Sequence, residues 1–216
     1  MVFFFRSSAL PAHCTWQIYT GRDKHENEDL IKHATNRDLW FHVDKYSSAH
    51  CYLRVDCETA SKCSDWWHNL PPDLLQHLAL LTKGNSITAS KLPSCSIIYT
   101  PATNLAKSGD MAVGEVGFKR ENGSMIGRLH IQKNSGLLKD IESTKVEVST
   151  EDFIAQTAKE QREFARATKT QKNTVAEAVA VSTPKPNADP YAALNNAKAM
   201  QSNRKASFDE DDFFSI

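Results

Sequence analysis

The sequence has neither a net charge nor a long apolar run, and both absences narrow its function. Lysine and arginine together number 26, as do aspartate and glutamate, among 216 residues. This balance excludes a uniformly basic polycation, so a surface that binds nucleic acid must arise from local separation of charge. No run of about 18 apolar residues occurs, and the sequence therefore predicts no transmembrane segment. The apolar stretch at the N-terminus is also too short for the core of a signal peptide.

Cysteine is scarce and has no pairing pattern. The five cysteines lie at positions 14, 51, 57, 63 and 95, and no Cys-x-x-Cys occurs. Their odd number favours reduced thiols in a cytoplasmic or nuclear protein over a secreted, disulfide-bonded one. The spacing of a cysteine zinc site is missing too. We expect neither a metal nor another cofactor.

Common catalytic and nucleotide-binding motifs are also missing. The sequence has no Gly-x-x-x-x-Gly-Lys-Ser/Thr, and Gly109, Gly114 and Gly117 have the wrong spacing for a dinucleotide loop. Neither Gly-x-Ser-x-Gly nor His-Glu-x-x-His occurs. The sequence therefore predicts a protein that is not an enzyme, without catalytic residues.

Composition changes near residue 149, which predicts a folded domain followed by a tail. Residues 1–148 hold all four tryptophans, all eight glycines and all eight histidines. Residues 149–181 read as a polar helix with a weak coiled-coil pattern. Residues 182–216 read as a disordered acidic tail with one short helix. Docking of its acidic, aromatic end on a protein partner is the alternative to a solvated end.

The hydrophobic pattern of the domain mixes strands and helices without a regular βαβ rhythm. We expect helices over Asn27–His33, from Pro71 to Gly84, and over Leu137–Ile141. We expect strands over Val2–Phe5, Thr15–Tyr19, Asp38–Val43, His50–Val55, Ser96–Thr100, Val113–Phe118 and Leu129–Gln132. This order favours an α+β fold, in which helices pack on a mixed, mostly antiparallel sheet.

A basic turn is the first candidate for binding. Gly21 permits a turn after a strand, and Arg22, Lys24 and His25 follow it. Backbone donors beside basic side chains can hold a phosphate. The alternative is a hydrated turn whose charge is neutralised by neighbouring acids, namely Asp23, Glu26, Glu28 and Asp29.

Two histidines, His42 and His50, are expected to face each other across adjacent strands. They fit buried core histidines, a hydrogen-bonded pair that closes a loop, a nucleic-acid contact, or a metal or acid–base site that uses Cys51. Their pattern favours the structural role. Trp66 and Trp67 cannot fully share one face, so we expect at least one to be partly exposed. Stacking on a base or filling a partner surface is the alternative to covering the helix that starts at Pro71, which the pattern favours.

The second half of the domain is mildly basic. Residues 83–148 carry nine lysines and arginines against six acids, whereas residues 1–82 carry eight against ten. Four of these cations lie near glycine-containing turns, where phosphate contacts are common: Lys107, Lys119, Arg120 and Arg128. An excess of this size is also typical of a solvated face.

Several spaced motifs resemble one family. Gly-Arg-Asp-x-x-x-Asn-Glu-x-Leu begins at Gly21, Asp-Leu-Trp-Phe-His-Val begins at Asp38, and a loop of the form x-x-His ends at His50. Together they resemble the NFACT-R domain of ribosome quality-control factors. The stretch from Tyr99 to Phe118 is similar to the small eukaryotic coiled-coil-domain-containing protein twenty-five family, as is the Met-Val-Phe start. The resemblance covers about residues 1–148.

The resemblance implies a non-catalytic α+β module that binds nucleic acid, RNA more than DNA, in association with the ribosome. Arg22, Lys24 and His25 would contact phosphates, helped by the cations of the second half. Matching motif residues are expected to support the fold: Gly21, Asp38, Trp40, His42, His50, Asn104, Gly114 and Gly117. The larger factors usually have asparagine where this chain has Asp23, whose carboxylate repels phosphate.

Two alternatives remain at this point. One is a DNA-binding protein associated with a membrane, and the other is an adaptor that acts through its tail. We expect a cytoplasmic location, with nuclear or peripheral membrane association as further options.

Overall fold

A computed structural model describes residues 1–11, 14–63, 65–121 and 123–182, with residues 167–182 described by their backbone alone. The chain forms two compact units, Met1–Arg166 and Ala167–Ile216. The first unit thus extends past residue 148, where the composition changes. The linker, short helix and acidic end expected between residues 183 and 216 lie outside the described residues.

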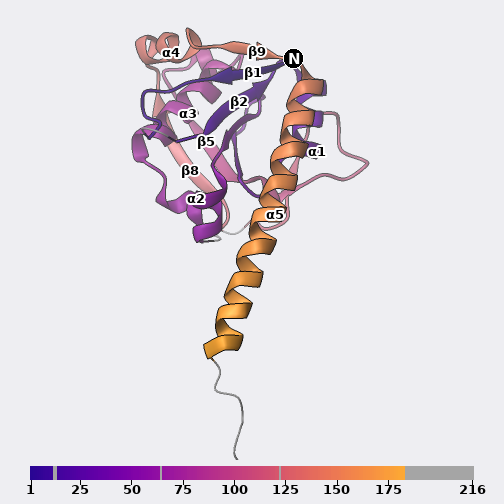
Figure 1. The fold of residues 1–216 in the computed structure, drawn as a ribbon. Coiled ribbons are helices and arrows are strands. Elements are labelled where there is room, and N and C mark those ends of the chain that lie inside the picture. The colour runs from indigo at the N-terminus through magenta and orange to yellow at the C-terminus, as the bar shows by residue number, and fades with distance from the viewer. Residues whose placement is uncertain (12–13, 64, 122, 183–216) are drawn as a thin grey trace, which may run out of the picture. The chain divides into compact units, whose positions relative to one another are not determined.

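Figure 1 shows the order of the elements along the chain. The strands are β1 (Val2–Phe5), β2 (Gln17–Gly21), β3 (Asp38–Val43), β4 (Cys51–Arg54), β5 (Ser94–Pro101), β6 (Leu105–Ala106), β7 (Gly117–Phe118), β8 (Gly127–Gln132) and β9 (Val146–Val148). The α-helices are α1 (Lys24–His33), α2 (Cys57–Lys62), α3 (Pro72–Gly84), α4 (Ser135–Glu142) and α5 (Thr150–Ser182). Short 3₁₀ turns are η1 (Trp66–Asn69), η2 (Ala89–Lys91) and η3 (Ala102–Asn104).

The expected α+β class is confirmed. Seven strands form one sheet in the order β8-β5-β3-β4-β2-β1-β9, and β6 and β7 form a separate pair. Every pairing of the seven-stranded sheet is antiparallel. Because successive residues of a strand point to opposite faces, each central strand contributes to two cores.

The two faces of the sheet carry different cores. Leu39, Phe41 and Leu53 face α3 and the turn η1, and α4 contacts α3 and adds Ile141 to the same core. On the other face, Trp40 and Tyr52 pack with residues of α1, the β6–β7 pair and the first turns of α5. The candidate interface lies on this second face.

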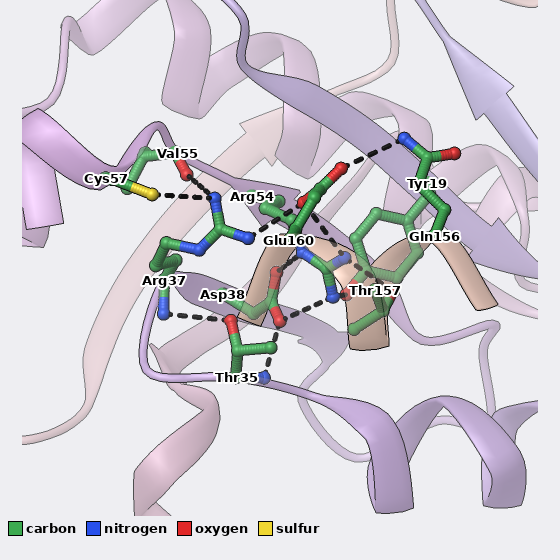
Figure 2. A network of polar contacts seen from close by, with 10 residues as sticks. All are labelled: Tyr19, Thr35, Arg37, Asp38, Arg54, Val55, Cys57, Gln156, Thr157 and Glu160. Carbon is green, nitrogen blue, oxygen red and sulfur yellow. Dashed lines mark hydrogen bonds and ion pairs between the residues drawn. The ribbon is translucent and has the colours of Figure 1, made fainter. Parts of the chain in front are cut away.

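A buried polar network fixes the start of α5 to the second face. Arg54 Nε donates to Asp38 Oδ1 over 2.7 Å, and its Nη1 donates to Thr157 Oγ1 over 2.7 Å. Arg37 Nη2 pairs with Glu160 Oε2 at 2.8 Å. Figure 2 shows both guanidinium groups converging on the helix. These bonds explain why the first turns of the polar helix belong to the folded unit.

Several expectations on the elements need correction. The second strand is Gln17–Gly21, so it extends further toward the basic turn than Thr15–Tyr19. Of Val113–Phe118, only Gly117 and Phe118 form a strand, because the preceding residues form a loop over α1.

The expected exposure of the tryptophan pair is wrong. Trp66 is only 5% exposed to solvent, and Trp67 only 1%. The 3₁₀ turn η1 lets both residues enter the core beside α3, which was their expected location. In the described part of the chain, no helix combines the length and apolarity needed to cross a membrane.

Candidate nucleic-acid interface

The basic turn is the N-terminus of α1. Asp23 caps this helix, since its Oδ1 accepts from the backbone N–H groups of His25 at 2.9 Å and Glu26 at 3.1 Å. Capping by a short polar side chain is a common way to begin a helix. The carboxylate that departs from the family pattern therefore has a local structural role.

The three basic residues of this turn differ in their surroundings. Arg22 lies 3.4 Å from Asp23 and 3.8 Å from Glu26, measured between charged atoms. Lys24 and His25 are exposed, and Lys24 forms no ion pair with any described residue. Charge compensation, the alternative considered for this turn, thus applies to Arg22 but not to Lys24.

Gly21 is required by close packing. A Cβ placed on Gly21 would lie 2.7 Å from Asn27 Oδ1 and 3.1 Å from the Asn27 backbone nitrogen. Gly21 keeps the ordinary extended backbone of a strand residue. Its role is therefore to admit the Asn27 side chain against β2.

The loop between β6 and β7 is fastened onto α1 through Glu28. Its Oε2 accepts from Gly114 N–H at 3.0 Å and pairs with Lys107 Nζ at 2.9 Å. The Gly114 N–H and the Lys107 amine lower the pKa of Glu28, so this acid stays ionised. Gly114 has a φ of +80°, and a Cβ there would approach Lys24 O to 3.0 Å.

Lys107 is engaged within its own loop. Besides Glu28, its Nζ donates to Ala112 O at 2.7 Å and Glu115 O at 2.9 Å. This leaves the amine occupied by three acceptors. The geometry assigns Lys107 to bracing the loop and leaves it little capacity for phosphate.

A pocket of about 450 Å³ lies between α1, the Ser47–Ser48 loop, the sheet and this fastened loop. Volumes of this size are typical of small-molecule sites. Lys24 is its cationic lining residue, and Glu115 is its acidic one. The other lining residues are Asn27, Trp40, His42, Ser47, Ser48, His50, Ile98, Val113, Gly114, Val116 and Phe118.

The two histidines meet in this pocket. Their ring centroids are 5.4 Å apart and nearly perpendicular, while His42 stacks on Trp40 with an interplanar angle of 3°. Burial, with smaller effects from His42 and Lys107, lowers the pKa of His50 to about 3. Burial also lowers the pKa of His42. Both rings are therefore neutral near pH 7 and offer hydrogen bonds and flat surfaces, not positive charge.

No group of three or more histidines, cysteines or acids that could hold a metal occurs among the described residues. Cys51 lies on the opposite face of the strand from His50, inside the α3 core. The alternative metal site built from His42, His50 and Cys51 therefore does not assemble.

The remaining cations lie on the β5–β8 side. The sheet register aligns His42 with Ile98 and Ile98 with Arg128, so exposed Arg128 follows the pocket residues in one row. Lys119 and Arg120 come directly after the lining residue Phe118. Lys119 Nζ donates to Thr103 O at 2.7 Å, whereas the exposed Arg120 guanidinium forms no ion pair with a described residue.

Asn104 and Gly117 are structural. The Asn104 side-chain N–H group donates to Arg120 O and to Thr100 Oγ1, and Asn104 Oδ1 accepts from the Arg120 backbone N–H, each over 3.0 Å. Gly117 pairs with Ala106 between β6 and β7, and Met111 Cε would lie 3.1 Å from a Cβ at Gly117. The two residues hold the segment that carries Phe118 and Arg120 against the sheet.

Sequence reasoning missed Asn27, Ile98 and Val116 as pocket residues. Asn27 was visible inside the Gly-Arg-Asp motif, where its spacing from Gly21 was the available signal. Ile98 and Val116 are apolar residues that only the sheet register and the loop position bring to the pocket.

Comparison with known proteins agrees with the motifs. The family model described as the NFACT protein RNA binding domain matches residues 1–120. Coiled-coil domain-containing protein 25 of Mus musculus is 44% identical over 147 residues, which cover 68% of this chain and 67% of that protein. Protein JLP2 of Saccharomyces cerevisiae is 40% identical over 122 residues, covering 55% and 56% of the two chains.

Among solved structures, a match is the C-terminal part of the fibronectin/fibrinogen-binding protein from Streptococcus suis. The TM-score is 0.49 with 16% identity, and the match covers 64% of this chain and 47% of that one.

Proposed function

The chain belongs to the family of the NFACT protein RNA binding domain, and from this premise we propose that it is a non-enzymatic RNA-binding protein that holds phosphates through Lys24 and its neighbours. The observation that carries the proposal is the position of Lys24. It is exposed, forms no ion pair with a described residue, and borders a pocket on the face that also carries Arg128.

His25, Lys119 and Arg120 extend this basic surface, Arg22 adds a guanidinium partly neutralised by Asp23 and Glu26, and Lys107 braces the loop beside it. Basic side chains around backbone turns contact phosphates and give affinity without reading the base sequence. Because the whole chain is neutral, the interaction depends on this one face. We further propose a cytoplasmic, ribosome-associated role, which co-sedimentation with ribosomal subunits at rising salt would test.

The proposal predicts the effect of reversing two charges. Lys24→Glu combined with Arg128→Glu should weaken binding to a structured RNA hairpin at least about tenfold, because each cation that neutralises a phosphate also releases counterions. The magnitude of the slope of log affinity against log salt should fall by about 1 to 2. Fluorescence anisotropy of a labelled hairpin at several salt concentrations measures both.

A matched control makes the same change of charge elsewhere. Lys91 and Lys139 are exposed on elements that belong to the α3 side of the sheet. Lys91→Glu with Lys139→Glu should leave affinity within about twofold of the original protein if binding is local. Equal losses in both double variants would reject a localised interface, and tighter binding to duplex DNA than to RNA would reject RNA as the ligand.

A further inference from the structure

Three residues that line the pocket beside Lys24 carry buried polar atoms without a partner. Six such side-chain atoms occur among the described residues, and three of them belong to residues that line this pocket: Trp40 Nε1, His50 Nδ1 and Asn27 Oδ1, of which the last packs against Gly21. Their side chains belong to residues that are 7%, 2% and 3% exposed. Buried polar groups in folded proteins are nearly always hydrogen-bonded, so these atoms are available to ordered water or to a ligand that replaces it.

The chemistry of these atoms is mixed. The indole N–H of Trp40 is a donor, the amide oxygen of Asn27 is an acceptor, and a neutral histidine ring offers one of each. Flat surfaces accompany them, since His42 is half-buried and stacked on Trp40, and Phe118 meets Trp40 edge-on at 5.8 Å. A planar heterocycle with donors and acceptors on its edge matches this lining.

The lining disfavours a phosphate inside the pocket. Its two histidines are neutral near pH 7, and the Glu115 carboxylate would repel an anion. Lys24 is exposed at the edge. A ligand with a neutral ring inside the pocket and a phosphate outside it, beside Lys24, therefore fits both the lining and the exposed lysine.

We propose that the pocket receives one unpaired nucleobase of the bound RNA, with the phosphate of that nucleotide beside Lys24. This inference rests on the proposed function and names the part of the RNA that the site holds. Proteins read single-stranded RNA by stacking unpaired bases and bonding their edges. A paired base is excluded, because its faces are stacked and its edge is already bonded in the duplex.

The first test examines the pocket without a long RNA. Each of the four nucleoside 5′-monophosphates is titrated into the full chain while the indole N–H signal of Trp40 is followed by NMR. We expect at least one nucleotide to shift this signal saturably and ribose 5-phosphate to leave it unchanged. A shift with ribose 5-phosphate of equal size, or no shift with any nucleotide, would overturn the proposal.

The second test uses two pocket variants and a matched control. His42→Ala removes a ring from the pocket, and Val116→Trp fills the pocket from its loop side. Each should weaken binding of a hairpin with an unpaired loop about tenfold, with little effect on a blunt RNA duplex. His68→Ala removes an exposed histidine of η1, on the α3 side of the sheet, and should leave both affinities unchanged. If the pocket variants bind the hairpin as tightly as the unchanged protein does, the proposal is also overturned.

The two tests separate this inference from the proposed function. If nucleotides shift the NMR signal of Trp40 but neither RNA binds, the nucleobase pocket is supported and the proposed RNA binding is rejected. If both RNAs bind through the basic residues, while the Trp40 NMR signal does not move and the pocket variants keep their RNA affinity, RNA binding is supported and the nucleobase pocket is rejected. Circular-dichroism melting of each variant shows that its fold is retained.

Discussion

At the scale of single residues, the pair Asp38–Arg54 explains why the Asp-Leu-Trp motif begins with an acid. Asp38 is fully buried and accepts from Arg54 at 2.7 and 2.9 Å, as well as from the backbone of Thr35 at 2.6 Å. A buried charge is tolerated only when its partners are in place. The motif residue therefore secures β3, β4 and, through Thr157, the start of α5.

We predict a large loss of stability when Asp38 is removed. Asp38→Ala leaves the Arg54 guanidinium buried without its carboxylate, which should lower the free energy of unfolding by about 3–5 kcal/mol. Urea unfolding followed by tryptophan fluorescence measures it. Glu58→Ala, which breaks the exposed pair of Glu58 and Lys62, should cost less than about 1 kcal/mol. Similar losses in the two variants would contradict this account.

At the scale of elements, α5 completes the domain. Phe153 is 2% exposed and packs against Tyr19 with ring centroids 4.9 Å apart. Thr157 and Glu160 supply the bonds to Arg54 and Arg37. A helix that looks polar in sequence thus contributes a short buried stripe, and one of its acids partners two buried arginines.

Truncation separates these turns from the rest of the helix. We predict that a chain ending at Val148 is unfolded or melts far lower than the full chain, because Tyr19, Arg37 and Arg54 lose their covering residues. A chain ending at Arg166 should melt within about 3 °C of the full length, a shift that corresponds to roughly 1 kcal/mol for a unit of this size. Thermal melting by circular dichroism compares them. A stable, cooperative domain ending at Val148 would show that α5 is dispensable.

At the scale of the whole molecule, the free energy of unfolding should depend on pH through His50. Its pKa is about 3 when folded and about 6.5 in a flexible chain. Between these values the unfolded state binds more protons, so stability is complete above pH 6.5 and falls as the pH drops toward 3. The contribution is about 1.4 kcal/mol per pH unit within this window.

His50→Gln removes this titration. We expect its unfolding free energy, measured in urea between pH 6.5 and 4.5, to fall less steeply with decreasing pH than that of the unchanged protein. Exposed His130→Gln serves as the control and should keep the original slope. An unaltered slope in His50→Gln would show that the ring is not held neutral by burial.

The strands could be predicted where the local pattern matched their final environment. Val2–Phe5 and Asp38–Val43 have the bounds expected from their apolar and β-branched residues. The start of α1 was set three residues too late, although Asp23 followed by Glu26 has the spacing of a helix cap. The partners of Arg54 could not be predicted, because Asp38 and Thr157 are brought to it only by the sheet register and by α5.

The candidate site was predictable in its charges but not in its shape. Lys24 and the two histidines follow from the motifs, whereas the pocket requires the loop held by Glu28 and Gly114 to close over α1. Local sequence does not reveal that the Lys107 amine is hydrogen-bonded within this loop. The same kind of residue is therefore free at position 24 and occupied at position 107.

The strand order has a consequence for synthesis. β1 lies between β2 and β9, and Val2 pairs with both Gly21 and Val148. While a ribosome is still making the middle of the chain, one edge of β1 has no neighbour, and an open strand edge is a template for pairing with other chains. The nascent protein can close that edge only after residue 148 has emerged, so the N-terminal strand is the last of the early strands to gain its full set of partners.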